Sequence, residues 1–223
     1  MPDEFIPLAE QSGVIRPLTM WVFEHALAQW GQWHQEGLEV RLSLNLSVRV
    51  LQDKGLPQRV AALIERHGID PGWVSLEVTE SAVMSDPMTA RRVLRQLADM
   101  GLKLSIDDFG TGHASLAYLK QLPVDEIKID RSFVRDIPSD PDDVAITRAI
   151  LALGHSLQMS IVAEGVESAE QLAFLTEEGC HEAQGSLVSE PLPEPEVRRL
   201  LQHGDATFFQ SPVKEGIKSG SLN

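Results

Sequence analysis

The sequence predicts an α/β fold in which parallel strands alternate with helices. Short strand-like runs alternate with helix-like runs along most of the chain, and each strand has one apolar face. Repeated strand–helix alternation of this kind favours parallel pairing. The pattern gives six strands, whereas a closed barrel of this type has eight.

The individual elements follow from apolar spacing and from Gly or Pro at their ends. For example, Gly68 ends one helical run before Pro71, and Gly101 ends the helical run that precedes the next strand. We expect helices at about 17–35, 55–67, 87–100, 113–121, 141–158, 168–178 and 194–202. We expect strands at 38–46, 74–78, 102–106, 126–130, 160–163 and 183–188.

Composition limits the classes of protein that the chain can represent. Its 223 residues suit one domain of barrel size or two small ones, and 43% hydrophobic residues are typical of a soluble globular protein. The lone Cys180, the lack of a secretory signal and the lack of a membrane-spanning apolar run predict a cytoplasmic protein. A net charge of −14 disfavours binding to a DNA or RNA polymer or to an anionic membrane.

Oxygen-bearing side chains recur near the carboxyl ends of the predicted strands. Alternation along each strand separates them from the apolar face that helices would cover. If the sheet curls, one set of side chains converges at the mouth formed by the carboxyl ends of the strands. The set consists of Lys128 and five oxygen-bearing residues: Asn45, Glu77, Asp107, Asp130 and Glu164. An open sheet with one wet face is the alternative, but it would carry mixed Lys, Arg, Thr and Glu. The oxygen set favours Mg²⁺ or Mn²⁺ over zinc.

The most informative segment is Ile106-Asp107-Asp108-Phe109-Gly110-Thr111-Gly112. Two adjacent carboxylates at the end of a buried strand are costly unless something neutralises them. A solvated turn would explain an isolated Asp-Asp pair, but the converging set favours a metal site. Asp107 would then bridge two cations and Asp108 would hold one, an arrangement that activates water for attack on phosphorus. The glycine-rich turn would form a mobile loop over the site.

Seven motifs occur in order: Phe5-Ile6-Pro7-Leu8-Ala9-Glu10, Asn45-Leu46-Ser47, Leu76-Glu77-Val78-Thr79-Glu80-Ser81, Asp107-Asp108-Phe109-Gly110-Thr111-Gly112, Lys128-Ile129-Asp130-Arg131-Ser132-Phe133, Ala163-Glu164-Gly165-Val166-Glu167 and Gln184-Gly185. Together they resemble the EAL-domain family of bacterial cyclic-di-GMP phosphodiesterases over about residues 2–202. The resemblance implies a TIM-like (β/α)₈ barrel over residues 1–203. It also implies hydrolysis of cyclic di-GMP to linear pGpG with two Mg²⁺ or Mn²⁺ ions, and inhibition by Ca²⁺. The segment 204–223 is rich in Gly, Ser and Lys, which predicts a flexible tail.

The resemblance also assigns roles to residues. Those matching metal ligands of the family are Asn45, Glu77, Asp107, Asp108 and Glu164. Lys128 and Asp130 match residues near the attacking water and the phosphate, and either Glu164 or Lys128 can be the general base. Residues matching loop-positioning or substrate-binding positions are Glu80, Gly110, Thr111, Gly112, Glu167, Gln184 and Pro191.

The sequence departs from the family pattern at its defining motif. Glu-Ala-Leu is absent, and its place would precede Met1, so we expect a barrel without its first two strands. His113, Ser186 and Glu190 also differ from the residues common at their positions. Because the missing Glu is a metal ligand of the family, the alternative to an enzyme is an impaired module that binds cyclic di-GMP or a protein.

The resemblance and the missing strands also suggest partners. Two exposed sheet edges would favour a homodimer. In a longer protein, a sensory or GGDEF-type domain would precede this one.

Overall fold

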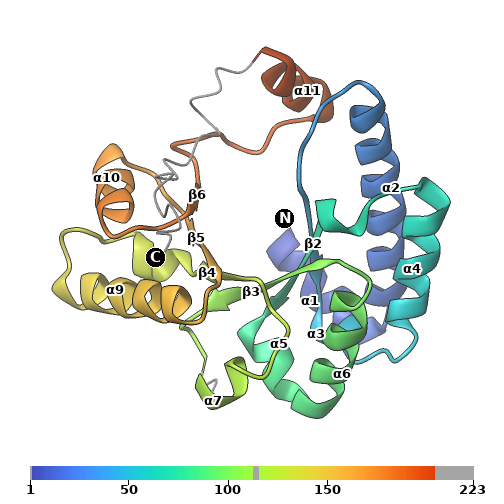
Figure 1. The fold of residues 1–223 in the computed structure, drawn as a ribbon, viewed down its shortest axis with the longest axis horizontal. Helices are drawn as coiled ribbons and strands as arrows, with labels where there is room; N and C mark the ends of the chain where they lie inside the picture. Colours follow the sequence, from blue (N-terminus) through green and yellow to red (C-terminus); the bar gives the residue numbers. More distant parts are fainter. Residues whose placement is uncertain (1, 113–115, 204–223) are drawn as a thin grey trace, which may run out of the picture. The chain divides into compact units, whose positions relative to one another are not determined.

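The computed structural model describes residues 2–112 and 116–203. The chain divides into two compact units, Met1–Glu190 and Pro191–Asn223. The first unit holds one sheet of six parallel strands that follow the chain order. These strands are β1 (Leu42–Leu46), β2 (Val74–Thr79), β3 (Lys103–Phe109), β4 (Glu126–Ile129), β5 (Ser160–Glu164) and β6 (Glu182–Gln184) (Figure 1). The predicted α/β fold with parallel strands is confirmed.

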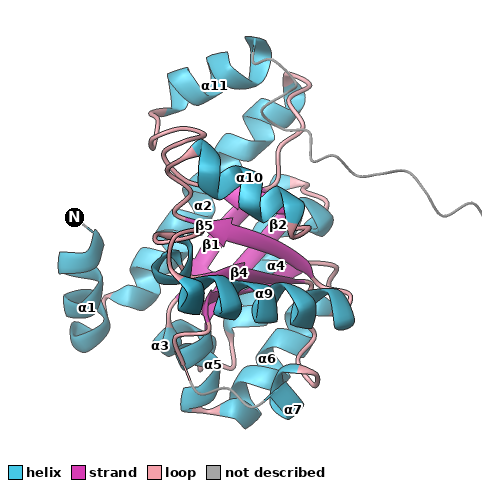
Figure 2. Ribbon diagram, turned by 90° about the vertical axis from the view of Figure 1, so that its left-hand side faces the viewer, coloured by secondary structure: helices cyan, strands magenta, loops and turns pink. Residues whose placement is uncertain are grey.

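Helices surround the strands of the first unit, as Figure 2 shows. They are α1 (Pro2–Ser12), α2 (Ile15–Gln35), α3 (Val48–Leu51), α4 (Leu56–His67), α5 (Glu80–Ser85), α6 (Pro87–Ala98), α7 (Leu116–Leu119), α8 (Arg131–Val134), α9 (Pro141–Ser156) and α10 (Ala169–Glu177), with a 3₁₀ turn at Pro71–Trp73. The second unit contains α11 (Glu194–His203). Among the described residues, no helix is both long enough and apolar enough to cross a membrane.

The sequence predicts the long elements within a few residues and misses several short ones. The helices α3, α5 and α8 begin one or two residues after a strand ends, in segments for which the apolar pattern predicts no helix. The sequence pattern also does not predict α1, because Pro7 lies inside this helix. Residues 113–115, with His113, and the predicted tail 204–223 lie outside the described residues.

Local signals explain where the helices start and stop. The Asp140 side chain accepts hydrogen bonds from the backbone N–H groups of Asp142 and Asp143, which caps α9. Gly68 ends α4 in the left-handed region at φ 62°, a conformation that glycine adopts without steric cost. These capping residues fix the points at which the chain turns back toward the sheet.

The two faces of the sheet differ as alternation predicts. Leu76, Leu104 and Ile127 are fully buried on the outer face, where the helices pack. On the inner face, Glu77 and Lys128 are 6% and 4% exposed. An ionised group is rarely buried to this extent without a partner, so the inner face must satisfy its own charges.

The sheet is strongly curled. In a flat sheet, β1 and β6 would lie roughly 24 Å apart, since five spacings of about 4.8 Å separate them. Arg41, immediately before β1, nevertheless contacts the Glu182 carboxylate at the start of β6 with an N–O distance of 3.7 Å. Arg41 also lies 3.6 Å from the Glu126 carboxylate at the start of β4. The inner faces of the strands therefore converge, as the barrel prediction requires.

Candidate functional site

A β-bulge places both aspartates of the Asp-Asp pair opposite one residue of the neighbouring strand. Ile106 pairs with Ile127 and Phe109 with Ile129, so Asp107 and Asp108 together face the single residue Lys128. Asp108 has a φ of 53°, which is uncommon for a residue other than glycine. Simple alternation along a strand would send Asp107 and Asp108 to opposite faces, and the bulge lets both reach the same site.

Glu80 anchors the glycine-rich turn that follows the bulge. Its carboxylate accepts a hydrogen bond from the Gly110 backbone N–H at 3.1 Å. Gly110 has a φ of 99°, and a Cβ there would lie 2.9 Å from the Phe133 ring, so only glycine fits. The predicted loop-positioning role of Glu80 is consistent with this contact, which joins α5 to the end of β3.

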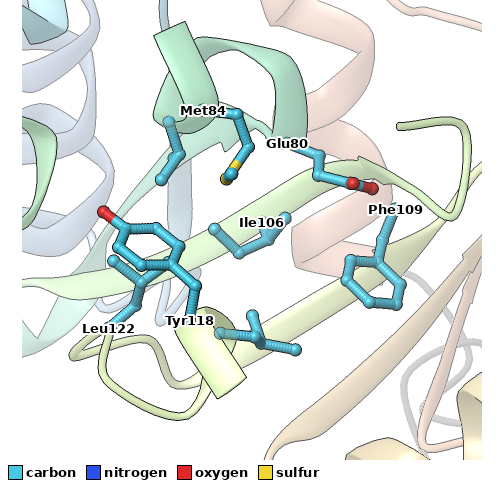
Figure 3. A pocket seen from close by; sticks show the side chains of 8 residues that line it. Glu80, Met84, Ile106, Phe109, Tyr118 and Leu122 are labelled. Atoms are coloured by element: carbon cyan, nitrogen blue, oxygen red, sulfur yellow. The ribbon is translucent and has the colours of Figure 1, made fainter. Parts of the chain in front are cut away.

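A small apolar pocket lies beside this anchor (Figure 3). Its lining includes Met84 from α5, Ile106 and Phe109 from β3, and Tyr118 from α7. The Tyr118 hydroxyl donates a 2.5 Å hydrogen bond to the Pro87 carbonyl, which fixes the ring at the edge of the pocket. Glu80 thus reaches the loop from apolar surroundings, where its hydrogen bond to the backbone is strong.

Three carboxylates meet at the carboxyl ends of β3 and β5. Asp107, Asp108 and Glu164 each offer an oxygen, and these oxygens all lie within 4.8 Å of one another. All three side chains are half-buried. A cluster of carboxylate oxygens is the ligand chemistry that Mg²⁺ and Mn²⁺ prefer, so the donor set fits the expected metal.

Lys128 lies among these carboxylates and neutralises part of their charge. Its ammonium is 2.5 Å from the Glu164 carboxylate and 2.9 Å from that of Glu77. A third carboxylate oxygen, from Asp107, lies 3.5 Å away. Residues from β2, β3, β4 and β5 are therefore joined through one ammonium group. Glu77 lies outside the three-carboxylate cluster and is held by Lys128 instead.

The pKa values reflect this crowding. Burial alone lowers the pKa of Lys128, but the hydrogen bond with Glu164 and the charges of Glu77 and Asp107 hold that pKa above its ordinary value. Burial raises the pKa of Glu164 despite the opposing effect of Lys128. Burial, with the nearby charges of Asp107 and Asp130, also raises the pKa of Asp108. Lys128 thus keeps its proton, while the two carboxylates bind protons more readily than usual.

Three more predicted residues, Asp130, Asn45 and Thr111, have contacts or pairings of a different kind. Asp130 caps α8 by accepting from the Ser132 backbone N–H at 2.9 Å. Asn45 pairs in register with Glu77 across β1 and β2, and its side chain is exposed. The Thr111 hydroxyl donates to the Asp108 carbonyl at 2.9 Å, which closes the turn.

Three further predicted residues are not joined to the cluster by a described side-chain contact. Gln184 ends β6 with an exposed side chain. Glu167 is exposed, and Pro191 opens the second unit. Their assigned roles stay predictions.

One buried polar residue near the site escaped prediction. Gln171 on α10 is 6% exposed and bonds to the segment that follows Glu164. The signal available in the sequence was Ser168-x-x-Gln171, which has the form of a capping box.

The geometry defines a class of protein: a curled parallel α/β domain with an acidic, metal-compatible site at the carboxyl ends of its strands. Residues 1–191 match the family model described as "EAL domain". The chain belongs to the EAL-domain family.

Curated relatives support the same assignment. The chain is 45% identical over 193 residues to MucR of Pseudomonas aeruginosa, a bifunctional diguanylate cyclase and cyclic di-GMP phosphodiesterase, covering 86% of this chain and 28% of that protein. It is 39% identical over 200 residues to the signaling protein YkoW of Bacillus subtilis, covering 90% and 25%. The chain therefore spans only about a quarter of these relatives.

Solved structures agree with the fold. A structure described as the PaMucR phosphodiesterase in complex with c-di-GMP superposes with a TM-score of 0.85 at 43% identity, covering 88% of this chain and 80% of that one. The EAL domain of Mycobacterium smegmatis DcpA gives a TM-score of 0.79 at 41% identity, covering 84% and 85%. The EAL type of TIM-like barrel is therefore confirmed for the six strands of this chain.

Proposed function

We propose that this domain hydrolyses cyclic di-GMP to linear pGpG in a reaction that depends on Mg²⁺ or Mn²⁺. The observation that carries the proposal is the meeting of the Asp107, Asp108 and Glu164 carboxylates, two of which also contact the Lys128 ammonium. The phosphodiesterases among its relatives add the substrate class. A bound cation would supply Lewis acidity and lower the pKa of a water molecule.

The proposed metal ligands are Asp107, Asp108 and Glu164, with Glu77 and Asn45 completing the set. The protein's contribution is to hold these oxygens close together before substrate arrives. Lys128 offsets their mutual repulsion, and the bulge at Asp108 brings the second aspartate to the same side as the first. Such preorganisation lowers the cost of assembling the site during the reaction.

The assignment of the proton acceptor follows from charge. Lys128 keeps its proton near neutral pH, because three carboxylates surround its ammonium. It therefore acts as a donor toward carboxylates or phosphate oxygens. We assign the general base to Glu164, because a carboxylate at the proposed metal site can accept a proton from water whereas the protonated Lys128 cannot. Asp130, beside Asp108, would help to orient the water.

The test is hydrolysis of cyclic di-GMP by the chain with Mg²⁺ or Mn²⁺, with Ca²⁺ in a parallel reaction. We expect pGpG with the first two ions and binding without turnover with Ca²⁺. Asp107→Ala should abolish turnover, whereas Asp99→Ala, which changes an exposed aspartate after α6, should leave it unchanged. Tight binding of cyclic di-GMP without turnover in either metal would overturn the enzymatic proposal and favour a binding module.

A further inference from the structure

The segment that follows Glu164 is held by a buried glutamine from the next helix. The Gln171 side-chain oxygen accepts hydrogen bonds from the backbone N–H groups of Glu167 and Ser168, at 2.7 and 2.9 Å. Its side-chain nitrogen donates to the Arg135 carbonyl at the end of α8, at 2.8 Å. One amide therefore joins the segment after β5 to the short helix after β4.

Both joined segments begin at residues of the proposed site. Glu164 ends β5, and Asp130 is the residue that caps α8. The two segments also pack tightly, because a Cβ on Gly165 would lie 2.6 Å from the Arg131 Cβ. Gly165 also has a φ of 69°. The close approach therefore needs glycine both for the space that a Cβ would fill and for the left-handed backbone conformation.

We propose that Gln171 is a positioning residue that fixes Glu164 relative to Asp130, an inference that rests on the proposed function. A buried amide with both ends bonded has few alternative arrangements, and breaking either bond leaves a buried polar group without its partner. Gln171 would thereby keep the Glu164 carboxylate at the distance from Asp107 and Asp108 that a cation requires. Partners behind the direct ligands commonly change metal affinity or activity about 10- to 100-fold.

The competing explanation is that Gln171 only caps its own helix. Ser168 and Gln171 form a capping box, in which each side chain bonds to the backbone of the other. Glutamate serves a capping box as well as glutamine does, since it offers the same acceptor oxygens. It cannot donate to the Arg135 carbonyl when ionised. The Gln171→Glu substitution therefore keeps the cap and removes the bond between the two segments.

The experiment compares Gln171→Glu with Ser168→Ala, which removes the other half of the capping box and leaves the bond to Arg135 intact. We expect Gln171→Glu to weaken Mn²⁺ binding, measured by titration calorimetry, by about 10-fold or more. We expect it to lower kcat by a similar factor while KM for cyclic di-GMP changes less than about twofold, as for a group that acts on the chemical step. Ser168→Ala should leave Mn²⁺ affinity, kcat and KM unchanged.

Equal Mn²⁺ affinity in Gln171→Glu and the wild type would overturn the inference, and so would an equal loss in Ser168→Ala. If Gln171→Glu does not fold, Gln171→Met, which removes both bonds with a side chain of similar length, takes its place. Hydrogen exchange on the wild-type protein gives a further check, since rapid exchange at the Glu167 and Ser168 amides would contradict the proposal. Absence of turnover in the wild type would defeat the proposed function alone, because Mn²⁺ affinity and exchange would still test Gln171.

Discussion

Replacing Lys128 by methionine removes the ammonium group that the Glu77, Asp107 and Glu164 carboxylates share. The Lys128 and Glu77 side chains are 5% and 8% exposed, so solvent screens their attraction little. Removing one partner of a buried ion pair costs about 3–5 kcal/mol, because a buried charge is left without compensation. For a chain of this size, that change lowers the unfolding midpoint by roughly 10 °C.

The assay is thermal unfolding of Lys128→Met and of the wild type, each in EDTA and in excess MgCl₂. We expect the large loss of stability in EDTA and a partial recovery with Mg²⁺, because a divalent cation can take over the neutralisation. Lys103→Met is the matched control, since its ammonium pairs with Asp125 at 3.0 Å but is 50% exposed and such pairs contribute at most about 1 kcal/mol. Equal stability of Lys128→Met and the wild type in EDTA would refute the reasoning.

Three more outcomes are expected. Gly185→Ala should lower the free energy of unfolding, measured by urea titration, by about 3 kcal/mol, because the added Cβ would lie 2.2 Å from the Val166 carbonyl oxygen. An unchanged free energy of unfolding would contradict this prediction. Glu80→Ala should speed hydrogen exchange of the Gly110 amide about 30-fold, as expected from losing a charge-assisted hydrogen bond of about 2 kcal/mol, and unchanged exchange would mean that the bond does not protect the loop. Burial raises the pKa of Cys180 to about 11 from 9.0, so iodoacetamide should label the folded thiol about 100-fold more slowly at pH 8 than the unfolded one. The free energy of unfolding should also fall as the pH rises from about 9 to about 11, because only the unfolded thiol ionises in that range.

The sequence could predict the strands and the inner residues because both follow from alternation. Glu77 and Lys128 face inward as predicted, with Leu76 and Ile127 buried on the other side. Local periodicity carries this information, so no tertiary structure is needed to extract it.

Other features depend on long-range geometry that periodicity does not encode. The bulge that turns Asp108 inward is a register shift between two strands, and neither strand reveals it alone. The helices α3, α5 and α8 have four to six residues each, too few to show a helical period. The second bond of Gln171 reaches Arg135, 36 positions away, so the sequence could indicate the cap but not the connection between loops.

The charge balance of the inner face bears on how many cations the site can hold. Glu77, Asp107, Asp108, Asp130 and Glu164 carry five negative charges when ionised, and Lys128 offsets one of them. Burial, together with this excess of negative charge, raises the pKa values of Asp108 and Glu164.

One divalent cation would leave this group of side chains negative, which opposes the approach of an anionic phosphodiester. Two would make the group about neutral, so that the phosphates of the substrate are no longer repelled. The proposed site therefore favours cooperative binding of a second cation and the dinucleotide. Titration of Mn²⁺ should give tighter binding of the second equivalent when cyclic di-GMP is present. Independent binding of metal and dinucleotide would show that charge balance does not govern this site.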